Sequence, residues 1–142
     1  MSLDDVKRRF VEEVKLRAYD DKYIDKNEER EILQIAIQQG VSVDSARAAL
    51  GQVCEANDYV VESKVVSQLK DLLDTLASND GKVDEKEFND AVTTCKKWTK
   101  GKRTDIQCKR MVIEIIDDNS YKVKTGLFSN WFNRVKKEVG MA

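Results

Sequence analysis

Apolar residues recur every three or four positions along most of the chain, which is the spacing of one face of an α-helix. The pattern predicts seven helices separated by short polar breaks, the last of them beginning near residue 125. The first helix runs to about residue 18, and Gly40 is placed to end the second. Five of the predicted helices follow a residue that can cap a helix N-terminus: Ser2, Asp25, Ser42, Asp84 and Thr104.

The predicted helices account for nearly the whole chain and leave no long linker. The stripe of the fourth helix, at residues 65–76, is broad enough for the centre of a bundle. The chain of 142 residues contains no proline and only six glycines, which favours helices with short connections. Its 41% hydrophobic residues suffice for a core that needs no disulfide or metal to stabilise it. These features predict an all-α fold, a single compact bundle of about seven helices forming one domain over residues 1–142.

One short acidic segment occurs twice, as AYDDKYIDKNE at residues 18–28 and ASNDGKVDEKE at residues 77–87. The matching acids lie 59 residues apart: Asp21, Asp25 and Glu28 in the first copy, Asp80, Asp84 and Glu87 in the second. Each copy separates two predicted helices. We therefore expect an internal duplication of helix pairs over about residues 3–98, followed by a C-terminal helical extension over about 99–142.

The acids of each copy have two interpretations. Asp25 with Glu28, and Asp84 with Glu87, have the spacing of a capping box, and Gly81 suits a turn with positive φ. Alternatively, the same six carboxylates could bind a divalent cation, calcium or magnesium, which prefers oxygen ligands. An EF-hand loop is not indicated, because the first position of such a loop needs an acidic ligand and the second copy has Leu76 there.

The doubled motif resembles the TerB-like (tellurite-resistance) family, in which an acid, a glycine, an aliphatic residue and Asp-x-x-Glu recur between helices. The resemblance covers about residues 5–98 and implies a helical bundle with two pseudo-repeats. It also implies an acidic site credited with divalent metal binding, and a scaffold or binding role in bacterial stress responses. The departure is Lys22, which stands where the family has glycine.

Residues 96–110 contain seven basic residues and one acid. A phosphate-binding surface would use the first five of them: Lys96, Lys97, Lys100, Lys102 and Arg103. A solvated connection between helices, balanced by acids elsewhere, explains the same run and is favoured over nucleic-acid binding.

The last predicted helix carries an aromatic stripe of four residues, Phe128, Trp131, Phe132 and Val135. The stripe could bind a partner protein or lie on a membrane, or it could pack onto the bundle. Packing is the favoured alternative.

Composition narrows the function classes. The chain has no histidine, and no glycine-rich phosphate loop or Cys-x-x-Cys motif occurs, so an enzyme is not indicated. The net charge of −1 does not indicate nucleic acid or an anionic membrane as the main partner. Cys54, Cys95 and Cys108 each fall in a helical stretch, where a free cysteine behaves as a small hydrophobe. The absence of a signal peptide and of a membrane span, with reduced cysteines, predicts a cytoplasmic protein.

The sequence thus predicts a non-enzymatic TerB-like interaction module of a bacterial stress-related process, with an unidentified protein partner. The alternatives are a divalent-cation sensor acting through the acidic turns and a helical nucleic-acid binder acting through residues 96–110.

Overall fold

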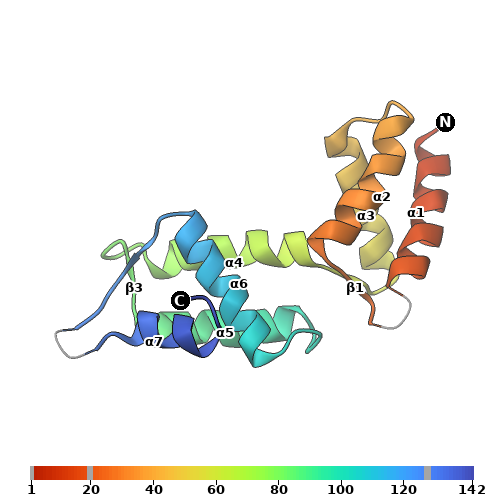
Figure 1. Ribbon diagram of the computed structural model, residues 1–142. Coiled ribbons are helices and arrows are strands. Elements are labelled where there is room, and N and C mark those ends of the chain that lie inside the picture. The colour runs from red at the N-terminus through yellow and green to blue at the C-terminus, as the bar shows by residue number, and fades with distance from the viewer. Residues whose placement is uncertain (1, 19–20, 127–128) are drawn as a thin grey trace. The chain divides into compact units, whose positions relative to one another are not determined.

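The computed structural model describes residues 2–18, 21–126 and 129–142, which form seven α-helices and four two-residue strands (Figure 1). The helices are α1 (Leu3–Arg17), α2 (Lys26–Gln38), α3 (Val43–Ala56), α4 (Glu62–Leu76), α5 (Glu85–Trp98), α6 (Asp105–Asp118) and α7 (Trp131–Glu138). The strands are β1 (Tyr23–Ile24), β2 (Val60–Val61), β3 (Lys82–Val83) and β4 (Lys122–Val123). The predicted all-α fold is confirmed.

The chain divides into two compact units, residues 1–63 and residues 64–142. The first unit contains α1, β1, α2, α3 and β2. The second contains α4 from its third residue onward, followed by β3, α5, α6, β4 and α7. The prediction of a single domain stays a prediction.

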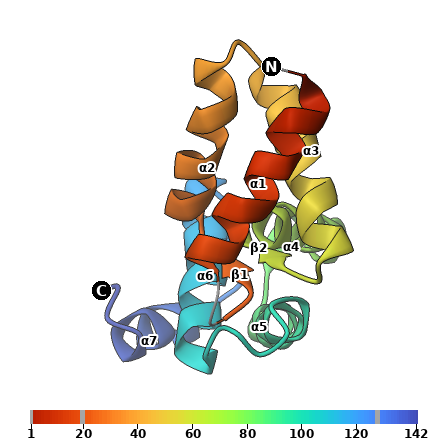
Figure 2. The ribbon, with the colours of Figure 1, turned by 90° about the vertical axis from the view of Figure 1, so that its right-hand side faces the viewer.

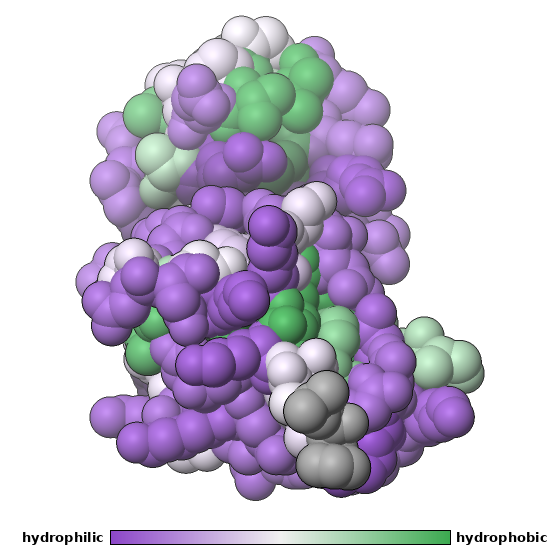
Figure 3. All heavy atoms as spheres, turned by 90° about the vertical axis from the view of Figure 1, so that its left-hand side faces the viewer, coloured by the Kyte–Doolittle hydropathy of each residue, from purple (hydrophilic) through white to green (hydrophobic). Residues whose placement is uncertain are grey.

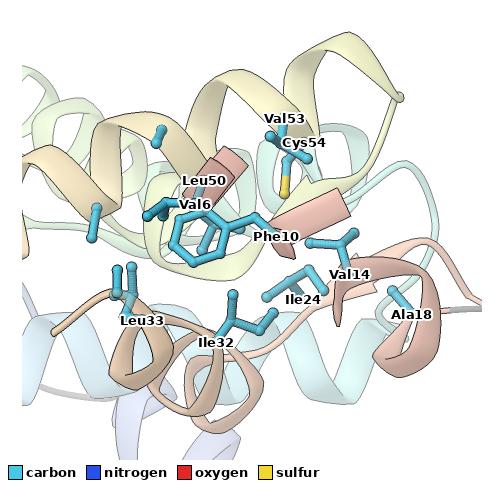
Figure 4. Packing of buried hydrophobic residues seen from close by; sticks show 13 residues of the cluster. Val6, Phe10, Val14, Ala18, Ile24, Ile32, Leu33, Leu50, Val53 and Cys54 are labelled. Atoms are coloured by element: carbon cyan, nitrogen blue, oxygen red, sulfur yellow. The ribbon is translucent and has the colours of Figure 1, made fainter. Parts of the chain in front are cut away.

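In the first unit, α1, α2 and α3 pack against one another around a continuous apolar core (Figure 2). Phe10 lies at its centre, with Ile32 from α2 and Leu50 from α3 close by (Figure 4). Val6 and Val14 lie one turn to either side on the same face of α1, and all three side chains are fully buried. β1 and β2 pair in parallel beneath these helices, with Tyr23 opposite Val60.

In the second unit, α5 packs against α6, and α7 packs against α6. The rings of Phe88 on α5 and of Trp131 and Phe132 on α7 meet with centroids 5.3–6.5 Å apart, in tilted and edge-on arrangements typical of buried aromatic clusters. β3 and β4 pair in parallel, with Val83 opposite Val123.

The order of elements in the second unit repeats that in the first. A helix, a strand, two helices and a second strand occur as α1, β1, α2, α3 and β2, and again as α4, β3, α5, α6 and β4. Each time, the two strands of the repeat pair with each other in parallel. The correspondence thus continues past residue 98 through α6 and β4.

The turns that follow α3 and α6 also correspond in detail. Asn57 and Asn119 each donate a side-chain hydrogen bond of 2.8 Å to the carbonyl four residues earlier. The next residues, Asp58 and Ser120, both have a left-handed backbone, with φ of 61° and 55°. The same local hydrogen bonding therefore turns the chain from a helix into a paired strand in both units.

Most helix starts agree with the sequence. Capping boxes at Ser2, Asp25, Asp84 and Thr104 are confirmed, and Ser42 accepts from the backbone N–H of Ser45 as predicted.

The last helix is an exception, because it begins at Trp131 and not near residue 125. The residues before it are used differently: β4 pairs with β3, and the Lys124 carbonyl accepts from the Trp131 indole at 2.9 Å. These contacts hold residues 122–124 in extended backbone, so the predicted start near residue 125 is wrong.

Candidate functional site

The first acidic turn links α1 to α2 through hydrogen bonds within the turn itself. Asp21 Oδ1 accepts from the backbone N–H of Tyr23 at 3.1 Å. Asp25 Oδ1 accepts from the N–H of Glu28 at 2.8 Å, and Glu28 Oε1 accepts in return from the N–H of Asp25 at 3.1 Å. The carboxylates thus satisfy three backbone donors that the turn and the helix start would otherwise leave unpaired.

The second acidic turn, between α4 and α5, uses the same three bonds. Asp80 Oδ1 accepts from the N–H of Lys82 at 3.0 Å. Asp84 and Glu87 form the reciprocal capping box, with distances of 2.7 Å and 3.0 Å. The structure therefore confirms the capping interpretation for both copies, acid for acid.

These bonds leave the cation hypothesis without structural support. One oxygen of each of the six carboxylates accepts a backbone N–H. Across residues 2–18, 21–126 and 129–142, no three His, Cys, Asp or Glu side chains are grouped in a way that could hold a metal ion. At the second turn, Lys124 Nζ already lies 3.7 Å from Asp80 Oδ2. Calcium or magnesium binding there stays a prediction.

Glu28 differs electrostatically from an ordinary surface glutamate. Burial raises the pKa of its carboxyl, and the neighbouring carboxylates Asp25 and Asp21 raise it further, against the opposing effect of the hydrogen bond from the Asp25 N–H. The folded chain therefore holds the Glu28 proton more tightly than the unfolded chain does.

The residue after Glu28 is a buried acid that sequence reasoning missed. Glu29 is 5% exposed, and its Oε1 lies 3.5 Å from Nε of Arg47 on α3. In the second unit the position 59 residues later is Phe88, which is fully buried. The repeat thus identifies residue 29 as an inward-facing position, and this alignment was the signal that could have revealed it.

Three residues of the basic segment, residues 96–110, form ion pairs or hydrogen bonds within the second unit. Lys109 Nζ lies 3.2 Å from Asp105 and 3.0 Å from Glu138, and Lys96 lies 3.8 Å from Asp105. Arg110 donates to the Val139 carbonyl at 2.7 Å. These contacts match the solvated, charge-balanced connection that the sequence favoured over nucleic-acid binding. Anion binding by the five predicted residues stays a prediction: Lys96, Lys97, Lys100, Lys102 and Arg103.

The aromatic stripe is packed within the second unit. Trp131 is 2% exposed, and Phe132 and Val135 are 9% exposed. Lys136 Nζ lies 4.7 Å from the centroid of the Phe132 ring, covering its outer side. These three side chains are therefore packed against the rest of the unit and are not exposed for binding a partner or a membrane. Phe128 lies outside the described residues.

Apolar side chains do reach the surface at one end of the first unit. Leu3 opens α1, Ile37 lies in the last turn of α2 and Val43 opens α3, and each is between 43% and 45% exposed. The start of α1 and the turn between α2 and α3 lie at the same end of the unit (Figures 1 and 2). Hydrophobic residues are visible at the surface of this unit in the upper part of Figure 3. We call Leu3, Ile37 and Val43 the apolar end.

The two units differ in charge. Residues 1–63 include 14 acidic and 9 basic residues, whereas residues 64–142 include 12 acidic and 16 basic residues. The apolar end therefore belongs to the acidic half of the chain.

None of the described helices is long and apolar enough to cross a membrane. Comparison of the chain with protein-family models, with curated proteins and with solved structures found no match.

Proposed function

We propose that the chain is a non-enzymatic interaction module of the TerB-like kind, which binds a protein partner in a bacterial stress-related process. The observation that carries this proposal is the apolar end of the first unit. The TerB-like family and the stress-related process are both inferred from the resemblance of the two acidic turns to the motif of that family.

The apolar end can serve as a contact surface because nearly half of each of its side chains is exposed. The core positions of α1 and α2, among them Val6 and Ile32, are by contrast fully buried. Burying the exposed part of these three aliphatic side chains against a partner would contribute roughly 1 kcal/mol each before the costs of association. Grouped apolar side chains at a surface are typical of protein-binding sites.

The charge of the first unit adds a second property of the partner. A unit with an excess of acidic residues attracts a partner whose contact surface is basic around an apolar centre. Such a complex forms more slowly at high salt, because screening weakens the attraction between exposed charges.

The test compares a double variant that places two carboxylates on the apolar end with a control that places one near the opposite end of α1. Ile37→Glu with Val43→Glu puts carboxylates on the apolar end. Leu16→Glu puts one at residue 16, which is 75% exposed near the opposite end of α1. Both are surface changes, and we expect the urea unfolding midpoints of both variants to stay close to that of the wild type.

The partner is first identified by cross-linking in the native host and then purified. We expect the wild type and Leu16→Glu to bind the purified partner alike, and the double variant to bind at least tenfold more weakly. Equal binding by all three proteins would overturn the role of the apolar end. Turnover of a substrate by the purified chain would overturn the non-enzymatic assignment.

A further inference from the structure

One thiol of α5 contacts two sulfur-containing side chains of α6 in the interior of the second unit. Cys95 projects from α5, and Cys108 and Met111 lie one turn apart on α6, which packs against α5. Both cysteines are fully buried and Met111 is 8% exposed. Both cysteines are outside any disulfide.

The separation of the Cys95 and Met111 sulfur atoms suits a shared ligand. Cys95 Sγ lies 3.8 Å from Met111 Sδ. Sulfur ligands about 2.3 Å from a metal are separated by about 3.8 Å in a tetrahedral site and about 4.0 Å in a trigonal one. The Cys95 thiol also reaches Cys108 closely enough to form a side-chain hydrogen bond with it.

Cys108 and the third cysteine of the chain, Cys54, lie in different surroundings. The hydrogen bond with Cys95 is the main cause that lowers the pKa of the Cys108 thiol, and Thr99 and Lys96 act in the same direction, against burial and the charge of Asp105. Cys54 in the first unit is the opposite case, because burial and the charge of Glu29 raise its pKa to about 11. Cys54 is thus a buried helical thiol in a different electrostatic environment, which makes it a suitable control.

We propose that Cys95, Cys108 and Met111 form a binding site for a monovalent thiophilic metal ion, copper(I). Two thiols and a thioether are soft donors, and soft sulfur ligands select copper(I) among the common biological metals. Zinc and calcium are disfavoured because thioether sulfur is not among their usual ligands. On binding, each thiol releases its proton to solvent, and the two thiolates with Cu⁺ carry a net charge of −1 near Lys96.

The site is tested with the full chain, reduced and kept without oxygen. Copper(I) is supplied as its acetonitrile complex in competition with bicinchoninate, whose coloured copper complex reports the metal that the protein does not hold. We expect the wild type to retain one copper(I) per chain. Cys95→Ala with Cys108→Ala should lose this binding, and Met111→Leu, which keeps the volume but removes the thioether, should weaken it about tenfold or more.

Cys54→Ala is the matched control, since it also removes a buried helical thiol, and it should bind copper(I) like the wild type. X-ray absorption of the wild-type complex gives a second result that does not depend on any variant folding. We expect a shell of three sulfur atoms around copper. A shell containing oxygen or nitrogen, or equal retention of copper by the Cys95→Ala, Cys108→Ala variant, would overturn the proposal.

Discussion

Lys22 and Gly81 occupy the same position in the two acidic turns and share a left-handed backbone, with φ of 53° and 71°. In both turns this residue donates its N–H to the carbonyl four residues earlier, which ends the preceding helix. Glycine adopts this conformation freely, whereas a residue with a Cβ is strained by it. The backbone of the first turn is therefore strained at Lys22, whereas the backbone of the second turn is not strained at Gly81.

Exchanging the residues should shift stability in opposite directions. We expect Lys22→Gly to raise the free energy of unfolding by about 1 kcal/mol and Gly81→Lys to lower it by about 1 kcal/mol. A Cβ at residue 81 would meet no atom within 4 Å, so backbone strain alone should produce the loss. Urea unfolding measures both, by circular dichroism for Lys22→Gly and by tryptophan fluorescence for Gly81→Lys, because Trp98 and Trp131 both lie in the second unit. No change in either variant would contradict this account of the turns.

The capping box at α5 predicts a graded response at Asp84. Asp84→Ala removes the acceptor for the Glu87 N–H and should lower the free energy of unfolding by about 1 kcal/mol. Asp84→Asn keeps an acceptor oxygen and should lie within about 0.5 kcal/mol of the wild type. Asp90→Ala, at an exposed position on the same helix, is the control and should be nearly neutral.

The same variants separate capping from cation binding. If the carboxylates serve only as caps, Asp84→Asn melts like the wild type whether or not calcium or magnesium is added. A cation-induced rise in Tm that is present in the wild type and absent from Asp84→Asn would support the cation hypothesis instead.

The raised pKa of Glu28 predicts a pH-dependent effect of Glu28→Gln. Because the folded state binds this proton more tightly than the unfolded state, stability gains from Glu28 as pH falls through its folded pKa to its unfolded value of about 4.5. Above its folded pKa the carboxyl is ionised in both states, and that gain is absent. Glutamine also serves in a capping box and carries no charge.

We therefore expect Glu28→Gln to be more stable than the wild type at pH 7, with the difference shrinking toward pH 4. Urea unfolding at several pH values between 4 and 7 measures it. A difference that stays constant over this range would mean that burial of the Glu28 charge is not its cause.

Local sequence signals predicted the helix starts well, because a capping box depends on residues only three positions apart. Asp25 with Glu28, and Thr104 with Gln107, could be recognised without knowing any tertiary contact. The parallel strand pairs could not, since β1 and β2 are only two residues long and pair with partners 37 positions away. The late start of α7 has the same origin, because it depends on the pairing of β4 with β3.

The interior contacts were equally hidden from the sequence. Helical spacing placed Cys95 on one apolar stripe and Met111 on another, but spacing within a helix does not say which residues of two stripes face each other. The 3.8 Å approach of their sulfur atoms is set by how α5 packs on α6. The burial of Trp131 was one of two alternatives for the same reason.

Glu29 and Arg47 provide a last test of how the first unit departs from the second. The Glu29 carboxylate is buried, and its partner Arg47 has a side chain that is 61% exposed. Removing the exposed partner leaves a buried charge without compensation, so Arg47→Ala should lower the free energy of unfolding by about 1–3 kcal/mol. Glu29→Met fills the site without a charge, as Phe88 does in the second unit, and should be neutral or stabilising.

The double variant isolates the pair. In the Glu29→Met background there is no buried charge to compensate, so Arg47→Ala should change stability by less than about 0.5 kcal/mol. Urea unfolding of the wild type, both single variants and the double variant completes the cycle. If Arg47→Ala costs the same in both backgrounds, its effect comes from lost packing of the arginine stem, and the ion pair with Glu29 contributes nothing to the first unit.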